Sequence, residues 1–177
     1  MIKDVMIIGD RIYLQNLTLE HASEEYAGWL NDSEVNRYLE TRKATIDDLK
    51  QYIQKQIDNP NSLFVGVFDK ESKTHIGNIK LEPIDWSRRT AVFGILIGDK
   101  NYWGKGIGTE ATKLIVDFAF KSLDLKEIEL GVISTNIPAI HVYKKVGFVI
   151  DRVEKNKMKH GNKLYDRIVM KIRRGSS

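Results

Sequence analysis

Three glycines directly precede a helical pattern in the segment DKNYWGKGIGTEATKLIVDFAF, residues 99–120. Gly104, Gly106 and Gly108 leave much bare backbone, and apolar residues then recur at steps of three and four, as on the buried face of a helix. The first amides of a helix have no partner within it, and the helix dipole adds about half a positive charge there. The segment therefore predicts an anion site for a phosphate or diphosphate, and the alternative is a tight turn whose glycines only supply positive φ.

Two familiar phosphate loops do not match this spacing. A P-loop requires G-x-x-x-x-G-K-[ST], whereas five residues separate Gly98 from Gly104, and Gly106 stands where Ser or Thr would hold magnesium. The dinucleotide fingerprint G-x-G-x-x-G fits Gly104 and Gly106 but has Thr109 in place of its third glycine. Neither nucleotide hydrolysis nor NAD binding is favoured.

Hydrophobic periodicity and turn residues predict strands and helices around one central sheet. Strands are expected at residues 11–17, 62–69, 74–85, 90–98, 126–133, 148–155 and 164–172. Helices are expected at residues 19–30 after Thr18 as N-cap, 33–39, 46–58 after a Thr45–Asp48 capping box, 108–122, and 137–146 with Pro138 in its first turn and Gly147 beyond its end. This order predicts an α/β (α+β) fold, a mixed central sheet of about seven strands flanked by about four helices, in one domain over residues 1–177.

The composition argues against several functional classes. The chain has no Cys, which excludes disulfides, a cysteine nucleophile and Cys-based metal sites, and no bound metal is expected. No apolar stretch approaches a membrane span and the first residues lack the shape of a signal peptide, so we expect a cytoplasmic protein without a membrane partner. The formal net charge is +4, with many basic residues near the C-terminus. Without a nucleic-acid motif, this excess predicts a solvated basic surface rather than nucleic-acid binding.

The glycine segment does match a third pattern. Trp103-x-x-Gly106-x-Gly108 resembles the cofactor loop Arg/Gln-x-x-Gly-x-Gly/Ala of the GNAT superfamily of acetyl-CoA-dependent N-acetyltransferases. Trp103 departs from the general pattern at the first position. The string WGKGIGTEA is similar to the branch that includes ribosomal-protein and nucleotide-sugar N-acetyltransferases.

A second segment, NIPAIHVYKKVGF, strengthens this resemblance. It carries Asn136, Ala139, Tyr143, Gly147 and Phe148 at the spacing of the family's second pattern. It follows the glycine loop in the family's order, and the expected elements agree with the family's fold over nearly the whole chain.

The resemblance implies where acetyl-CoA binds. The amides of residues 105–109 would hold the diphosphate, and the main chain of residues 95–97 would meet the pantetheine arm in a slot where this strand diverges from the next. Asn136 would reach the same arm, or cap a helix, and Lys105 and Lys145 would assist the phosphates, or only face solvent. The residues implied for acetyl-CoA binding are Ile95, Leu96, Ile97, Trp103, Gly104, Lys105, Gly106, Ile107, Gly108, Thr109, Asn136, Ala139, Tyr143 and Lys145.

Tyr143 is implied as the catalytic acid. Acetyl transfer to an amine needs a neutral amine, a polarised thioester carbonyl and a proton for the leaving thiolate. The phenol of Tyr143 occupies the family's position for supplying this proton, and the alternative is a core aromatic residue on an amphipathic helix.

The general base is not identified in the sequence. Many relatives carry Glu two residues before the Gly of a segment like A-E-F-G, but here the segment is AVFG and the position is Val92. The remaining candidates, each with a surface or structural role as the alternative, are Glu82, Asp85, His75, Glu110 and His141. Glu82 and Asp85 rank first because they end a strand beside the expected acceptor cleft. Water, or an acceptor of low pKa, would remove the need for a base.

The leading hypothesis is an enzyme that moves the acetyl group to a primary amine of a small molecule such as an amino-sugar. The alternatives are a protein N-terminus as acceptor, as in ribosomal-protein acetyltransferases, and a non-catalytic module that binds acyl-CoA. The acceptor walls are expected at residues 29–42 and 82–89. Their candidate contacts for a sugar or diphosphate, otherwise ordinary surface residues, are Arg37, Tyr38, Arg42 and Trp86. The resemblance also implies a homodimer, with no interface apparent from the sequence.

Overall fold

A mixed sheet of eight strands organises the fold. The structure, a computed structural model, describes residues 2–39 and 43–175. In this described part the strand order is β1-β2-β3-β4-β5-β6-β8-β7. The strands are β1 (Met6–Ile8), β2 (Ile12–Asn16), β3 (Leu63–Asp69), β4 (His75–Asp85), β5 (Thr90–Ile97), β6 (Glu127–Ile133), β7 (Val149–His160) and β8 (Lys163–Arg173). The helices are α1 (Glu24–Asn31), α2 (Ile46–Asp58), α3 (Ile107–Lys121) and α4 (Ile137–Val146), with 3-10 turns η1 (Leu19–His21), η2 (Asn36–Tyr38) and η3 (Lys100–Tyr102).

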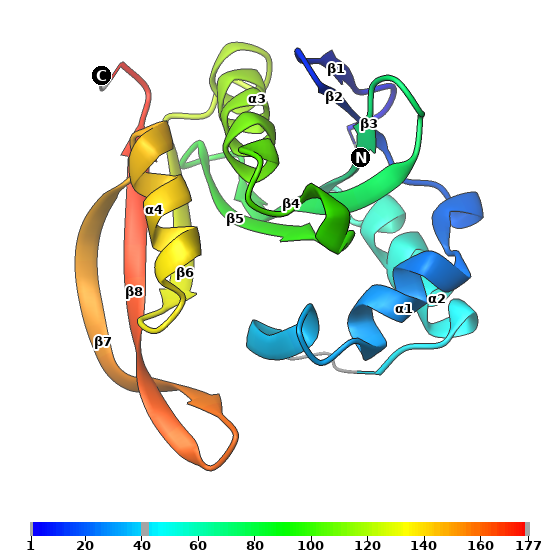
Figure 1. The fold of residues 1–177 in the computed structure, drawn as a ribbon. Helices are drawn as coiled ribbons and strands as arrows, with labels where there is room; N and C mark the ends of the chain where they lie inside the picture. The colour runs from blue at the N-terminus through cyan, green and yellow to red at the C-terminus, as the bar shows by residue number, and fades with distance from the viewer. Residues whose placement is uncertain (1, 40–42, 176–177) are drawn as a thin grey trace.

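The sheet splits between β5 and β6. These two strands are parallel and pair only at their beginnings, through Thr90–Glu127, Ala91–Ile128 and Val92–Glu129. Beyond Val92, β5 continues to pair with β4 as far as Ile97, while β6 follows β8 as far as Ile133. The edge of β5 that faces β6 is therefore unpaired along its second half (Figure 1). The diverging strands implied by the resemblance are present.

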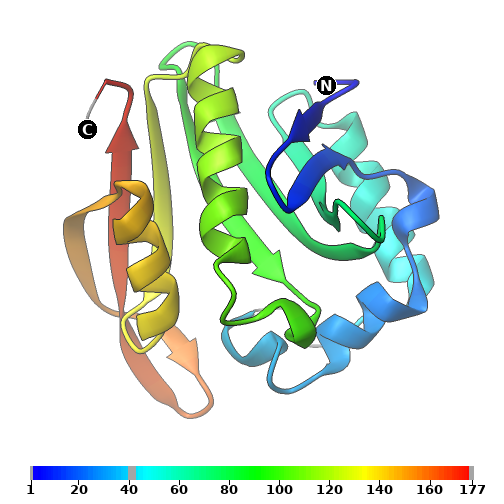
Figure 2. The same cartoon turned by 45° about the horizontal axis from the view of Figure 1, so that its top comes forward.

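Helices cover both faces of the sheet. Figures 1 and 2 show α3 and α4 on one face and α1 and α2 on the other. The first face buries a core that includes Ile115 of α3 and Ile128 of β6. The second face buries a smaller core around Trp29 of α1 and Ile53 of α2. Apolar positions at helical spacing thus place one pair of helices on each side.

Two expected helices have the expected ends. Thr45 and Asp48 form the capping box of α2, in which the Asp48 amide donates to Thr45 Oγ1 over 3.1 Å and the Thr45 amide donates to Asp48 Oδ2 over 2.9 Å. Pro138 lies in the first turn of α4, and Gly147 follows that helix with a φ of 121°. Because this φ favours glycine, the chain can leave α4 there and enter β7.

The N-terminal helices differ from the expectation. Thr18 precedes only the single turn η1, and α1 begins at Glu24 with Ser23 as its N-cap, where the Tyr26 amide donates to Ser23 Oγ over 3.1 Å. The helix expected over residues 33–39 is only the turn η2. The buried side chain of Asn36 donates from Nδ2 to Leu30 O over 2.9 Å, so a side-chain bond to the backbone helps to hold this short turn.

The sheet has one strand more than the seven expected. β1 pairs with β2 around the turn at Gly9 and Asp10, with Ile8 opposite Tyr13. This strand is three residues long, and the side chains of Met6 and Ile8 are 55% and 66% exposed. Its sequence therefore lacks the alternation of buried and exposed residues that would predict a strand. Among the described residues, no helix has the length and apolar character needed to cross a membrane.

Candidate active site

The glycine loop combines a tight turn with an open helix start. Gly104 and Gly106 have φ values of 70° and 80°, and Gly106 is the N-cap of α3. These two positions favour glycine for conformation, as the turn interpretation predicts. Gly108 lies in the first turn with an ordinary φ, and a Cβ built there meets nothing within 4 Å. The first turn of α3 therefore has free space on the side of Gly108.

Arg11, near the N-terminus, hydrogen-bonds to this loop and to the start of α3. Its backbone amide donates to Glu110 Oε1 over 2.9 Å, and its Nε donates to Glu110 Oε2 over 2.9 Å. Its Nη1 donates to the carbonyl oxygen of Lys105. Burial alone would raise the pKa of Glu110, but the hydrogen bonds and charge of Arg11 outweigh it and lower that pKa below its ordinary value. Glu110 is therefore a structural carboxylate, and Arg11 was not singled out by the sequence because it lies 99 residues away.

The edge of β5 beyond Val92 that faces β6, here called the slot, presents main chain without a strand partner. Ile95 and Leu96 lie beyond the last pair with β6, so alternate backbone groups on that edge have no strand partner. The carbonyl oxygen of Ile97 accepts a hydrogen bond from Trp103 Nε1 over 2.7 Å. Trp103, the unusual first residue of the loop motif, is thus bonded to the strand end rather than directed at the loop.

Asn136 acts as a helix cap. It is the N-cap of α4, and its Oδ1 accepts a hydrogen bond from the Ala139 amide over 3.3 Å. Asn136 Oδ1 therefore caps α4, as the alternative interpretation predicted. The side-chain nitrogen, Nδ2, is not used by the cap. Lys105 and Lys145 are both exposed, and neither forms a salt bridge with any described residue.

Tyr143 is a residue of α4 whose ring packs against β5. Its side chain is 8% exposed, and its ring contacts Phe93 of β5 and Phe148, each with centroids 5.9 Å apart. Burial raises the pKa of Tyr143 to about 12, so its hydroxyl stays protonated. Within residues 2–39 and 43–175 no group hydrogen-bonds to this hydroxyl, and no fully buried side-chain polar atom lacks a partner. The hydroxyl is therefore not sealed inside the core and is free to donate.

Two candidates for a general base are already engaged. The carboxylate of Glu82 accepts from Asn59 Nδ2 over 3.0 Å and pairs with Lys80 over 3.1 Å. Asp85 accepts hydrogen bonds from the Arg88 amide and the Ser87 hydroxyl in the turn after β4, and these lower its pKa. Neither carboxylate faces the slot unpartnered.

The two histidines offer no better base. His75 is enclosed by aromatic rings, and burial lowers its pKa to about 4 even though its Nε2 lies 2.7 Å from Asn78 Oδ1 and 3.0 Å from Gly77 O. His141 is an exposed residue of α4. Val92, the position of the missing acid, lies opposite Glu129, whose carboxylate is 3.6 Å from Arg152 and 3.7 Å from Lys171. No residue is assigned as the base.

A cavity of about 730 Å³ opens on the α1–α2 face and is here called the acceptor cleft. Its floor includes Asn78 and Lys80 of β4 and Gly94 of β5. Its remaining lining residues are Tyr26, Leu30, Tyr38, Leu39, Lys43, Ala44, Asp48, Leu49, Tyr52, Phe64, Ile95 and Leu96. Ile95 and Leu96 belong both to this lining and to the open part of β5, so the cleft meets the slot at the same strand.

Only part of the cleft was anticipated from the sequence. Tyr38 lines it as expected, and Arg37 lies 5.2 Å from the Tyr38 ring but does not line the cleft. Trp86 lies elsewhere, with its Nε1 donating to Pro60 O over 3.2 Å, and Arg42 falls outside the described residues. Tyr26, Tyr52, Asn78 and Lys80 were missed because they come from three separate elements and share no local motif.

The charged residues of the cleft are mostly basic. Its lining holds Lys43 and Lys80 against Asp48, whose carboxylate already caps α2. Lys80 Nζ donates to the Tyr52 hydroxyl over 2.8 Å, and although burial lowers its pKa, the bonds to Tyr52 and Glu82 raise it overall, so Lys80 stays charged. The tip of the β7–β8 hairpin also reaches this region, where the His160 ring lies 5.9 Å from that of Tyr38.

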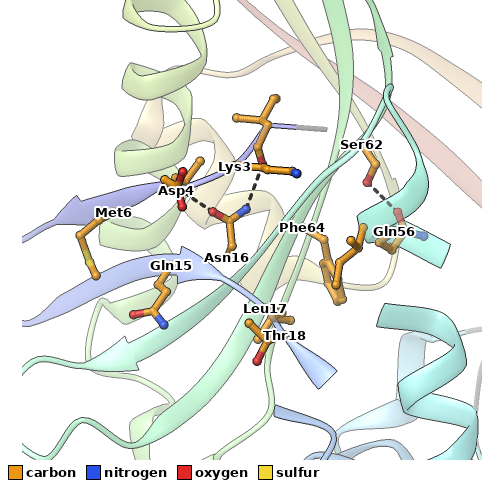
Figure 3. Close-up of a pocket in the computed structure, with 13 residues that line it drawn as sticks. Lys3, Asp4, Met6, Gln15, Asn16, Leu17, Thr18, Gln56, Ser62 and Phe64 are labelled. Atoms are coloured by element: carbon orange, nitrogen blue, oxygen red, sulfur yellow. Dashed lines mark hydrogen bonds between the residues drawn. The ribbon is translucent and has the colours of Figure 1, made fainter. Parts of the chain in front are cut away.

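A second cavity, of about 530 Å³, lies beside β1, β2 and α2. Figure 3 shows two internal hydrogen-bond networks in it: Asn16 binds the backbone of Ile2 and Val5, and Ser62 Oγ donates to Gln56 Oε1 over 2.6 Å. Neither the glycine loop, β5 nor Tyr143 lines this cavity. It is therefore not the place where a group from the slot can reach an acceptor.

Known acetyltransferases resemble this chain in sequence. A family model described as "Acetyltransferase (GNAT) domain" matches residues 11–149. "Probable N-acetyltransferase YjcK" of Bacillus subtilis (strain 168) is 28% identical over 175 residues, covering 94% of this chain and 96% of that protein. Spermidine N(1)-acetyltransferase of Escherichia coli (strain K12) is 35% identical over 123 residues, covering 68% of this chain and 64% of that protein.

Solved structures share the fold. Spermidine N-acetyltransferase from Vibrio cholerae, in complex with CoA and spermine, matches with a TM-score of 0.87 at 24% identity, covering 95% of this chain and 98% of that one. Ribosomal-protein-S5-alanine acetyltransferase from Vibrio fischeri matches with a TM-score of 0.82 at 20% identity, covering 97% and 98%. The fold is therefore that of the solved acetyltransferases.

The chain belongs to the GNAT acetyltransferase family. The expected fold class and the expected enzyme class, an acetyl-CoA-dependent N-acetyltransferase, are thereby confirmed. The individual residues of the active site and the identity of the acceptor remain predictions.

Proposed function

We propose that the protein transfers the acetyl group of acetyl-CoA to the primary amine of a small, hydroxyl-rich molecule, an amino-sugar in particular. One observation carries this proposal: the acceptor cleft and the slot meet at the same strand, because Ile95 and Leu96 line both. A donor in the slot and an acceptor in the cleft would approach each other across the backbone of β5. Holding two reactants in this way removes much of the entropic barrier to their reaction.

The slot fits coenzyme A on three counts. The bare amides of residues 107–109 suit a diphosphate, since they lie at the start of a fifteen-residue helix. The unpaired edge of β5 suits the amide chain of pantetheine, because both carry donors and acceptors in a row. Lys105 and Lys145 are exposed cations, one in each of the two motif segments. When bound, acetyl-CoA supplies the activated thioester carbonyl.

Tyr143 is the proton donor of this proposal. Its ring is held by Phe93 and Phe148, and its hydroxyl has no partner among the described residues. A phenol whose pKa is about 12 releases its proton late, so Tyr143 stabilises the departing sulfur first by a hydrogen bond and then by proton transfer. The proton of the amine passes to water, because the position of the usual strand acid is Val92, and water returns a proton to Tyr143 at the end of the cycle.

The cleft suits a neutral or anionic acceptor better than a polyamine. Tyr26, Tyr38, Tyr52 and Asn78 place phenols and an amide around it, groups that bind hydroxyls. A polyamine carries several positive charges, and the described carboxylates at this site are already engaged, Asp48 by the Thr45 amide and Glu82 by Lys80. The named spermidine acetyltransferases among the relatives therefore support the reaction but not the same acceptor.

The test is release of free thiol from acetyl-CoA with an acceptor panel. The panel holds glucosamine, glucosamine 6-phosphate, a uridine-diphosphate amino-sugar, spermidine, and a peptide with a free N-terminal alanine. Turnover with an amino-sugar and not with spermidine is expected. Turnover only with the peptide would favour the ribosomal-protein type, and CoA binding without any turnover would favour an acyl-CoA-binding module. A homodimer and a cytoplasmic location stay predictions.

A further inference from the structure

The contact between Arg11 and the start of α3 joins residues that are 99 positions apart in the sequence. Arg11 immediately precedes β2, after the turn at Gly9 and Asp10, whereas Glu110 lies in the first turn of α3. Two parallel bonds of 2.9 Å join the Arg11 amide and Nε to the two carboxylate oxygens of Glu110. A third bond runs from Arg11 Nη1 to the carbonyl oxygen of Lys105. One side chain thus ties both ends of the loop together.

The loop needs such a tie because its glycines are flexible. Gly104 and Gly106 adopt left-handed φ values, and glycine loses more conformational freedom on ordering than any other residue. Within the described part of the chain, Arg11 is the only side chain from outside the loop and α3 that hydrogen-bonds the main chain of residues 104–108. Trp103 cannot replace it, because its indole is bonded to Ile97 O.

We propose that Arg11 is a positioning residue for the diphosphate of CoA. It fixes the amides at the start of α3 in the arrangement that receives the anion, so the ordering cost is met before binding. Glu110 is the partner through which it acts, and its negative charge offsets that of Arg11. The pair therefore works by geometry and not as a bare positive charge. This inference rests on the proposed CoA site.

Isothermal titration with CoA is the test, on the variants R11K, R11M and E110Q. R11K keeps the charge but loses the planar fork that matches a carboxylate, and E110Q keeps the shape but loses the charge. All three are expected to weaken CoA binding by about tenfold or more, as loss of charge-assisted hydrogen bonds does. The double variant R11M/E110Q should be no weaker than R11M, because both changes break one contact.

Pantetheine separates this role from a general structural one. S-Acetylpantetheine lacks the diphosphate, so its KM as donor should be the same in the variants and the wild type. The control E154Q removes an equal charge from the β7–β8 hairpin, where Glu154 pairs with Arg167 over 2.8 Å, and should leave CoA binding unchanged. Thermal unfolding without ligand reports any loss of fold, and R11K and E110Q carry the test if R11M does not fold.

Two results would overturn the inference. If R11K binds CoA like the wild type and E110Q binds it more tightly, Arg11 acts as a charge alone. If KM for S-acetylpantetheine rises as much as the Kd for CoA, the contact supports the whole active site and not the diphosphate. A wild-type protein that does not bind CoA would instead refute the proposed function, so the two failures are distinguishable.

Discussion

Lys80 of β4 lies directly opposite Gly94 of β5 in the antiparallel ladder, and both line the acceptor cleft. The Lys80 ammonium is fixed by the Tyr52 hydroxyl at 2.8 Å and by Glu82 at 3.1 Å. A Cβ built at Gly94 would meet nothing within 4 Å. A fixed charge therefore stands beside an opening in the cleft floor, where an acceptor has room to approach β5.

Filling that opening should block the acceptor. Gly94→Leu places a branched side chain in the free space that the acceptor would otherwise occupy. A bound acceptor would then be overpacked against it, which costs about 1–3 kcal/mol and should raise the acceptor KM by about tenfold or more. CoA binding should change far less, because the slot lies across the strand. Steady-state kinetics and titration with CoA measure the two effects.

The matched control for this change is Gly28→Leu. Gly28 is an exposed residue of α1 that also has nothing within 4 Å of a built Cβ. Its replacement should leave both KM and CoA affinity at wild-type values. An acceptor KM that does not move in Gly94→Leu would show that the acceptor binds elsewhere.

Removing the Tyr143 hydroxyl should slow the chemical step. Tyr143→Phe keeps the ring packed on Phe93 and Phe148 but removes the proton donor. A fall in kcat of about 10²-fold is expected at saturating acceptor, the lower end for a positioned acid, with little change in acetyl-CoA affinity. Tyr165→Phe, on β8, is the control and should keep full activity. Unchanged kcat in Tyr143→Phe would reject the assigned role.

Two glycine substitutions should separate conformation from open space. Gly108 has an ordinary φ and free space, so Gly108→Ala should fold at least as stably as the wild type yet weaken CoA binding. Gly104 also has space but a φ of 70°, so Gly104→Ala should lower the free energy of unfolding by about 1–2 kcal/mol. Urea unfolding and CoA titration on both variants give the comparison. If Gly108→Ala binds CoA as tightly as the wild type, the diphosphate does not bind beside Gly108.

Acid should destabilise the protein through His75. Burial lowers the pKa of His75 to about 4, below its ordinary value of 6.5, so the unfolded chain binds more protons between these values. The free energy of unfolding that neutral His75 contributes is fully present above pH 6.5 and is lost as the pH falls toward 4. At its largest it is worth about 3 kcal/mol.

Urea unfolding at several pH values between 7 and 4.5 measures this loss. His21, whose ring lies 5.7 Å from that of His75 and whose pKa burial also lowers, contributes in the same direction. His75→Gln keeps a donor for Asn78 but cannot take up a proton, and should flatten the pH dependence. If the free energy of unfolding falls as steeply with pH in His75→Gln as in the wild type, groups other than His75 cause the loss of stability.

The glycine loop was the most predictable part of the site. Its glycines, the following helix and the Asn136–Phe148 segment are each contiguous in sequence, so their resemblance to the motifs of one family could be seen directly. The capping box of Thr45 and Asp48 was predictable for the same reason. Local patterns identify local structure, and they also predicted most of the order of strands and helices along the chain.

The acceptor cleft was not predictable because it has no local pattern. Asn78 and Lys80 meet Tyr26 and Tyr52 only after the sheet and two helices have packed. The Arg11–Glu110 contact joins residues 99 positions apart, which no single-sequence periodicity reports. At α1, Thr18 and Ser23 are both acceptable caps, and tertiary packing decides between them.

The three-pair seam between β5 and β6 has a consequence for how selectivity is encoded. Unpaired strand edges normally lie at the periphery of a sheet, but β5 carries one in the interior, between two paired halves. Its amides and carbonyls are already ordered there, and they belong to the backbone. With coenzyme A bound along this edge, as proposed, its recognition would depend little on side-chain identity, so substitutions could change the acceptor while the donor stays the same.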